Sequence, residues 1–289
     1  DALAAESEGD TKLQLELAWA YQNLRHLPDR KLSERKLISE KAVVLTQKVI
    51  QAEPSNLAAR DRLAMIYLDM IFDSRLGGDV NFTLDYNRRA VSIVDEILRE
   101  SPDEIEYQDS FWTANYHYAL TMQQLGRADE TIETARKILP VAEKMYQTNT
   151  DGYDYMKPHL TRTSIGYGLN YKGDYAAAIK EFETALGECR AEQIKKPDAD
   201  ILRRNEANIL LQLASALENS GDVQTAFNHA ETALKIRTKL AAANPTDLDY
   251  TLAVADGEVN YAQIIWRQNQ KAETTNRFRR ALEIYEKII

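Results

Sequence analysis

An internal repeat of about 48 residues runs through this chain and constrains its fold more than any other feature. One small or aliphatic residue recurs inside successive apolar runs, at steps of 48, 48, 47, 48 and 48: Ala42, Ala90, Ile138, Ala185, Ala233 and Ala281. A second series marks the preceding runs: Leu17-Ala18, Leu63-Ala64, Tyr118-Ala119, Ile165-Gly166, Leu213-Ala214 and Tyr261-Ala262. Six such units account for all 289 residues. We therefore expect one repeat domain over 1–289, with repeats near 8–55, 56–103, 104–150, 151–198, 199–246 and 247–289.

Each unit is predicted to be a pair of helices. In the fourth unit the segment 174–186 places its apolar residues on one helical stripe: Tyr175, Ala178, Ile179, Phe182, Ala185 and Leu186. Gly173 and Asp174 supply a stop for one helix and an N-cap for the next. The two series lie 20 residues apart in the last four units but 25 and 27 apart in the first two, so we expect insertions in those two internal connections.

Composition and charge exclude several classes of protein. Only 11 Gly and 7 Pro are present, which argues against an all-β or disordered chain. The net charge of −9 argues against a nucleic-acid partner, and we interpret the basic stretch 25–36 as a solvated turn and helix start. The single Cys189 excludes an intrachain disulfide, and no apolar run is long enough for membrane insertion. Because the chain opens with Asp1, we expect it to be part of a longer protein.

The repeat resembles the tetratricopeptide repeat (TPR). The matching residues are Gly166, Gly173-Asp174-Tyr175, Ala178, Phe182 and Ala185, and again Ala214, Gly221-Asp222, Ala226, Ala230 and Ala233. The unit is longer than the standard 34 residues. The resemblance implies an all-α fold: an α-solenoid of about six long helix-turn-helix repeats wound into a right-handed superhelix.

A narrower resemblance covers nearly the full chain. The segments 1–24, 77–91 and 233–255 are similar to the repeat region that follows the kinase domain in some bacterial serine/threonine kinases. In those proteins a transmembrane helix commonly separates the kinase from the repeats. The resemblance implies a sensory or scaffolding module on the extracytoplasmic side of a bacterial membrane; without that layout the chain would be cytoplasmic. The segment 105–120 fits the pattern worst.

Catalytic motifs are absent from the sequence. The four histidines, His26, His117, His159 and His229, are scattered and form no pair at metal-ligand spacing. No phosphate-binding loop, nucleophile elbow, zinc-protease motif or kinase catalytic loop is present. We therefore expect a chain that is not an enzyme and takes no cofactor or metal. An enzyme built on helical repeats has only the abundant acidic residues in its favour.

The TPR resemblance places a binding groove on the first helix of each repeat. Carried onto this sequence it gives Tyr116, His117, Gln123, Thr163, Tyr167, Asn170, Tyr171, Asn208, Gln212, Ser215, Asn219, Asn260, Gln263, Trp266 and Arg267. Asn and Gln side chains can hydrogen-bond the backbone of an extended peptide, and Tyr and Trp add contact area. The alternative is that these residues are an ordinary polar helix face.

Two further hypotheses remain open at this point. The first is a receptor for a small ligand or short peptide, of the kind found in bacterial regulators with similar repeats. The second is self-association through a terminal repeat, because the chain ends with the apolar Ile284, Ile288 and Ile289.

Overall fold

The computed structural model describes residues 9–27, 30–76, 78, 80–148, 152–267 and 269–288, with the side chains of 74–76 left aside. Over these residues the chain forms twelve α-helices and one short 3-10 helix, and it contains no strand. This confirms the all-α prediction. In the described part of the chain, no helix is both long and apolar enough to cross a membrane. The chain divides into two compact units, 1–125 and 126–289, so the expectation of a single domain and of a right-handed superhelix stays a prediction.

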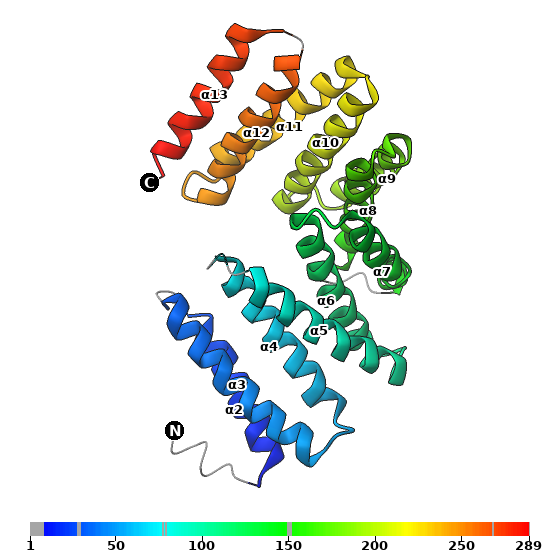
Figure 1. The fold of residues 1–289 in the computed structure, drawn as a ribbon, viewed down its shortest axis with the longest axis vertical. Coiled ribbons are helices and arrows are strands. Elements are labelled where there is room, and N and C mark those ends of the chain that lie inside the picture. Colours follow the sequence, from blue (N-terminus) through cyan, green and yellow to red (C-terminus); the bar gives the residue numbers. More distant parts are fainter. Residues whose placement is uncertain are drawn as a thin grey trace. The chain divides into compact units, whose positions relative to one another are not determined.

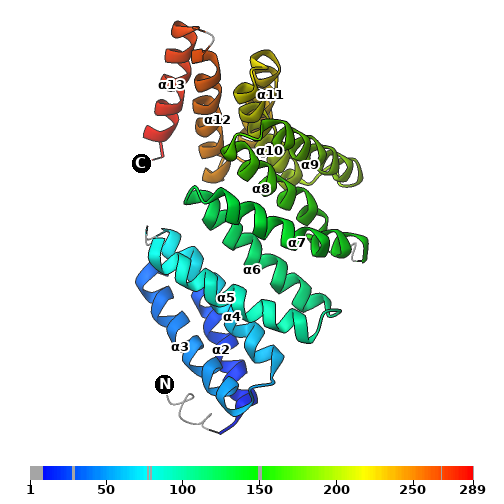
Figure 2. The same cartoon turned by 45° about the vertical axis from the view of Figure 1, so that its right-hand side comes forward.

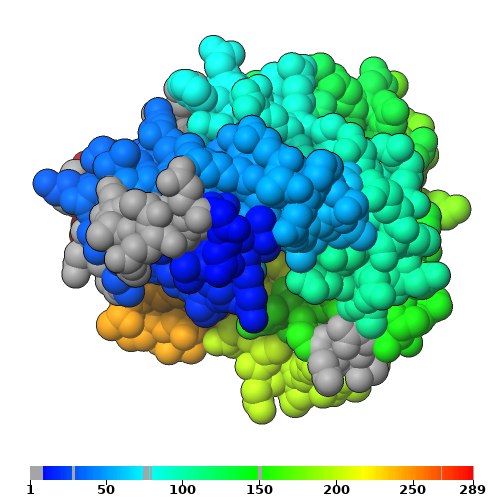
Figure 3. Space-filling view, turned by 90° about the horizontal axis from the view of Figure 1, so that it is seen from below, coloured from blue at the N-terminus to red at the C-terminus, as the bar shows by residue number. Residues whose placement is uncertain are grey.

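Unit 1 consists of five helices that pack in chain order. They are α2 (Thr11–Arg25), α3 (Leu32–Ala52), α4 (Leu57–Leu76), α5 (Val80–Glu100) and α6 (Ile105–Gln124). Each helix contacts its successor, and α4 also contacts α6. The antiparallel pairs α2–α3 and α4–α5 are visible in Figure 1. Figure 3 shows part of the surface of unit 1, coloured from dark blue at α2 through light blue at α4 to cyan at α5.

Unit 2 continues the same hairpin pattern. Its elements are α7 (Ala128–Thr148), η1 (Asp154–Met156), α8 (Lys157–Lys172), α9 (Tyr175–Lys195), α10 (Asp200–Ser220), α11 (Val223–Ala243), α12 (Leu248–Arg267) and α13 (Lys271–Glu286). Consecutive helices pack together, and α8 also contacts α10. Figure 2 shows α12 and α13 as an antiparallel pair. Within each unit the arrangement is that of an α-solenoid of TPR-like repeats.

The predicted turn residues end and begin the helices of unit 2. Gly173 and Gly221 take the left-handed conformation, with φ of 85° and 98°, which glycine adopts without steric cost. The carboxylate that follows each glycine then caps the next helix. Asp174 accepts a hydrogen bond from the Ala177 amide at 3.3 Å, and Asp222 accepts one from the Thr225 amide at 3.1 Å. The Gly-Asp pairs therefore fix where each hairpin turns.

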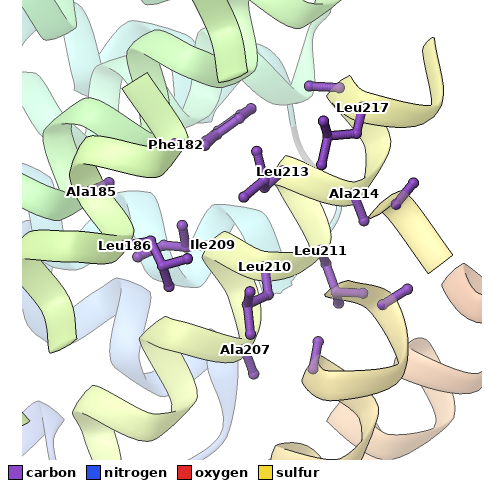
Figure 4. Close-up of a cluster of buried hydrophobic side chains, with 14 of the residues drawn as sticks. Phe182, Ala185, Leu186, Ala207, Ile209, Leu210, Leu211, Leu213, Ala214 and Leu217 are labelled. Atoms are coloured by element: carbon purple, nitrogen blue, oxygen red, sulfur yellow. The ribbon is translucent and has the colours of Figure 1, made fainter. Parts of the chain in front are cut away.

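Both residue series of the repeat lie in the core. The series on the second helices is at most 2% exposed, and the alanines of the series on the first helices are fully buried. Phe182 and Leu186 of α9 face Leu213 and Ile209 of α10 (Figure 4). An added Cβ at Gly166 would lie 2.6 Å from Cε1 of Phe182, so glycine is required for the hairpin to close at this spacing.

The insertion expected in the second repeat lengthens a helix instead of a connection. α4 extends to Leu76, twelve residues beyond Ala64, whereas α10 ends six residues beyond Ala214. The extra turns carry Asp73, which pairs with the Arg25 guanidinium at 3.0 Å. Arg25 is only 3% exposed, so the expectation of a solvated basic stretch is wrong at this residue. Asp69 neutralises it from a second side, at 3.3 Å.

Candidate functional site

The predicted binding residues fall on the first helix of each hairpin. Tyr116, His117 and Gln123 lie on α6 in unit 1, and the other twelve lie on three helices of unit 2. We call these twelve the amide face: Thr163, Tyr167, Asn170 and Tyr171 on α8, Asn208, Gln212, Ser215 and Asn219 on α10, and Asn260, Gln263, Trp266 and Arg267 on α12.

Exposure divides the amide face into two sets. The exposed set consists of Tyr171, Asn208, Asn219, Asn260, Gln263, Trp266 and Arg267. The half-buried set consists of Thr163, Tyr167, Asn170, Gln212 and Ser215. Two large aromatic side chains stand out because they are 62% (Tyr171) and 57% (Trp266) exposed. No residue of the face is fully buried, so each could contact a partner.

Hydrogen bonds join the amide face across neighbouring hairpins. The Asn170 side-chain amide donates to the Ser215 hydroxyl at 3.2 Å, and the Asn219 amide donates to the Asn170 carbonyl oxygen at 3.1 Å. One step further along, Glu218 pairs with Arg267 at 3.2 Å. The Asn170–Asn219 and Glu218–Arg267 links each join a residue four positions after the repeat's small residue to one five positions after it in the next hairpin. The structure thus brings α8, α10 and α12 together at one register.

The same register carries a polar link in unit 1. Gln22 donates to Asp69 at 3.3 Å, and these two residues occupy the equivalent positions on α2 and α4. A polar link at this position therefore recurs between several pairs of hairpins and is not peculiar to unit 2. Part of the polarity of the amide face is structural, because Asn170, Ser215 and Asn219 already bond one another.

A buried arginine that the sequence analysis did not select lies behind the amide face. Arg237 on α11 is 9% exposed, and its Nη2 donates to the Asn208 side-chain oxygen at 2.9 Å. Its Nη1 donates to the Ala253 carbonyl on α12 at 2.8 Å. The guanidinium thus connects the second helix α11 with both neighbouring first helices. Asn260 differs from Asn208, since its amide donates to the Asp256 carbonyl of its own helix at 2.6 Å.

A sequence signal for this arginine exists in the repeat register. In the first five repeats, the residues four positions after the small residue of the second helix are Thr46, Val94, Ala142, Cys189 and Arg237. The first four are at most 1% exposed, so this is a core position that takes a cation once. Comparing equivalent positions, instead of searching for motifs, would have found it.

The three predicted residues of unit 1 are more enclosed. Tyr116 is half-buried and stacks on Trp112, with ring centroids 4.7 Å apart, and burial raises the pKa of Tyr116 to about 12. His117 packs edge-on against Phe72 at 4.9 Å. Gln123 is half-buried.

The described residues offer little for catalysis. No group of three or more His, Cys, Asp or Glu side chains that could hold a metal ion is found among them. Burial raises the pKa of the Cys189 thiol to about 12, so the thiolate needed for a nucleophile does not form at neutral pH. Burial also raises the pKa of Glu218, while the nearby Arg267 opposes the shift. The ion pair with Arg267 accounts for the presence of the Glu218 carboxylate at this position.

The apolar C-terminal end is partly covered by the chain itself. Ile284 and Ile288 are half-buried, and Ile289 lies outside the described residues. Self-association through this repeat therefore stays a prediction.

Comparisons with known proteins identify the fold. No family model matches the sequence, and no curated protein matches it. A solved structure of BtubC (BKLC) from P. vanneervenii is similar, with a TM-score of 0.63, 15% identity, and coverage of 90% of this chain and 93% of that one. Apo RapI gives a TM-score of 0.58 at 12% identity, covering 94% and 98%. A Rap protein complexed with Competence and Sporulation Factor gives 0.57 at 15%, covering 97% and 73%. The chain has the fold of the TPR-like helical-repeat proteins.

Proposed function

We propose that this chain is a non-catalytic module whose amide face binds an extended segment of a protein or peptide. The observation that carries the proposal is the combination on one register of hydrogen-bonding amides with two exposed aromatic rings, Tyr171 and Trp266. Aromatic side chains bury a large area, and Trp and Tyr are enriched among the few residues that dominate binding energy in interfaces. Exposed amides offer both donors and acceptors to a peptide backbone.

The similarity to a Rap protein complexed with Competence and Sporulation Factor supports this proposal. That structure contains the same kind of fold with a bound factor. It also favours a second candidate function, a receptor for a short peptide that changes shape on binding. The two functions differ in the response of the protein. A receptor would become more compact when its ligand is added, as measured by small-angle scattering, and a rigid scaffold would keep its dimensions.

The resemblance to the repeat region of bacterial serine/threonine kinases supports a finer proposal. The module would recruit a partner to a kinase or bias kinase pairing, on the extracytoplasmic side of the membrane. The check is the coding sequence upstream of Asp1. A kinase catalytic loop followed by about 20 apolar residues supports the attachment, and an upstream region with neither removes it.

A displayed library of random seven-residue peptides tests the binding surface without knowledge of the partner. Enriched peptides should bind the chain and lose at least about tenfold in affinity with Tyr171→Ala or Trp266→Ala, since each change removes an exposed aromatic contact. Tyr153→Ala is the matched control, because Tyr153 is 69% exposed and lies on the turn before η1. Equal affinities for all four proteins would remove the amide face from consideration.

A further inference from the structure

The joint between two successive hairpins of unit 2 uses a fixed set of repeat positions. Phe182 and Leu186 of α9 face Leu213 and Ile209 of α10 (Figure 4), and all four side chains are at most 6% exposed. Counted from the small residue of each helix, the α9 pair occupies positions −3 and +1, and the α10 pair occupies −1 and −5. The second helix of one hairpin thus supplies one half of the joint, and the first helix of the next hairpin supplies the other half.

Further contacts confirm these positions. At the next joint Leu234 of α11 occupies position +1 and Gly257 of α12 occupies −5, and an added Cβ on Gly257 would lie 3.0 Å from Leu234 Cδ1. The first helices also meet each other, because Asn170 at +4 on α8 bonds Ser215 at +1 on α10 at 3.2 Å. The joint therefore repeats along unit 2 with the same register.

The last hairpin carries the second-helix half of this joint on its surface. Phe278 and Leu282 of α13 occupy −3 and +1, the positions of Phe182 and Leu186, but they are 43% and 55% exposed. On α12 the +4 position holds Trp266, which is 57% exposed. On the five earlier second helices the −3 residue is at most 1% exposed: Ser39, Asn87, Ala135, Phe182 and Ala230.

The first helix carries the complementary half of the joint on its surface. Leu13 and Leu17 of α2 occupy −5 and −1, the positions of Ile209 and Leu213; Leu13 is 43% exposed and Leu17 is half-buried. Trp19 at +1 is 50% exposed. On the five later first helices the −5 residue is buried: Ala59, Ala114, Thr161, Ile209 and Gly257.

We propose that these two faces bind each other between separate molecules, so that the α12–α13 hairpin of one copy receives α2 of a second copy. Leu13 and Leu17 of the second copy then pack on Phe278 and Leu282, as α10 packs on α9. The same register brings Trp19 against Trp266, in the places of Ser215 and Asn170. Exposed apolar patches of this kind mark interaction surfaces, and here the internal joint specifies the occupant.

Such a contact is heterologous, because it joins two different surfaces of the chain. A pair of molecules joined in this way still has one copy of each face available, so association can continue beyond a dimer. Each face belongs to a single unit of the chain. The inference does not rest on the proposed function, because its occupant is a second copy of the chain and its main contacts lie outside the amide face.

Sedimentation equilibrium of the chain measures the association. The mean mass should exceed that of one chain and rise with concentration between about 5 and 500 µM. Leu13→Asp and Leu282→Asp should each weaken self-association at least about tenfold, since each places a charge in the joint. Ile194→Asp is the matched control, because Ile194 is 84% exposed on α9 and lies outside both faces, and it should associate like the unchanged chain.

Mixing the two variants tests the pairing of unlike faces. The Leu13→Asp chain keeps the α13 face and the Leu282→Asp chain keeps the α2 face, so each is monomeric alone. Their mixture contains one intact joint and should give a 1:1 dimer with twice the mass of one chain and no larger species. The tryptophan emission should shift to shorter wavelength on mixing, because Trp19 and Trp266 become buried. Circular dichroism checks that each variant is folded, and Trp19→Glu replaces Leu13→Asp if that variant is not.

Three outcomes would overturn the proposal. A chain that stays monomeric at every concentration leaves the two faces to other partners. A Leu13→Asp chain that still dimerises shows a symmetric contact through α13, and a Leu282→Asp chain that does so shows one through α2. A mixture that stays monomeric excludes the pairing of the two faces. None of these results bears on the peptide-library test, because neither Leu13 nor Leu282 belongs to the amide face.

Discussion

His159 makes unit 2 sensitive to mild acid. The imidazole is fully buried on α8, its Nε2 lies 3.2 Å from the Asn205 side-chain nitrogen, and its Nδ1 has no hydrogen-bond partner among the described residues. Burial lowers the pKa of His159 to about 4 from an ordinary 6.5, and the charge of Glu192 opposes this shift only in part. The folded protein therefore binds the proton less readily than the unfolded chain does.

The sign and size of the effect follow from these pKa values. Since the folded pKa is the lower one, the stability contribution is fully present above pH 6.5 and is lost as the pH falls toward 4. The full difference corresponds to about 3.4 kcal/mol, of which about 2 kcal/mol is lost between pH 7.5 and pH 5.0. The variant His159→Gln lacks this titration. Other groups titrate in both proteins and cancel in the comparison.

Urea unfolding followed by circular dichroism at the two pH values measures the effect. Whatever the stability of His159→Gln itself, the wild-type free energy of unfolding should fall by about 2 kcal/mol more than that of the variant. An NMR titration of the histidine ring should show no protonation above pH 5. The reasoning is refuted if both proteins lose the same stability, or if the ring titrates near pH 6.5.

Two further predictions concern the packing and charge of the core. Gly166→Ala should lower the free energy of unfolding by about 1–3 kcal/mol, because the new Cβ would collide with the buried Phe182 ring. Gly187→Ala on α9, with open space around it, should raise the free energy of unfolding by about 0.5–1 kcal/mol. Similar effects of the two changes in urea unfolding would contradict the close approach of Gly166 to Phe182. Burial raises the pKa of Asp61 to about 6, so its ionisation costs stability as the pH rises from 3.8 through 6. Asp61→Asn should therefore raise the unfolding free energy by about 3 kcal/mol at pH 8 and by only about 0.5 kcal/mol at pH 4, and a gain independent of pH would exclude this explanation.

The fold could be predicted from the sequence because its determinants are local and repeated. The spacing of small residues fixes which stripe of each helix is buried, and the Gly-Asp pairs at 173–174 and 221–222 fix where the hairpins turn. Apolar periodicity says less about an insertion, which can lengthen a loop or a helix at similar cost. In α4 it lengthened the helix, and Asp73 then reached Arg25.

The candidate site was only partly predictable for a related reason. The resemblance selected residues that lie on the first helix of each hairpin, but it could not show which amides are already bonded to a neighbouring hairpin. Arg237 was missed because a single charged residue in a helical pattern is usually solvated. It packs against another helix beside Gly257, 20 residues away, where an added Cβ would lie 3.4 Å from its Cδ. The apolar periodicity within either segment does not reveal such a contact, and only the comparison of equivalent repeat positions singles out the arginine.

The bonds from Asn170 to Ser215 and Asn219, and from Glu218 to Arg267, span the joints between successive hairpins of unit 2. Any molecule that competes for these side chains must loosen a joint, and any force that opens a joint must release them. Occupancy of the surface and the angle between adjacent hairpins are consequently linked variables, each of which shifts the other by the same free energy. Mechanical strain that opens a joint would thus strengthen the binding of such a molecule, and its binding would favour the open joint.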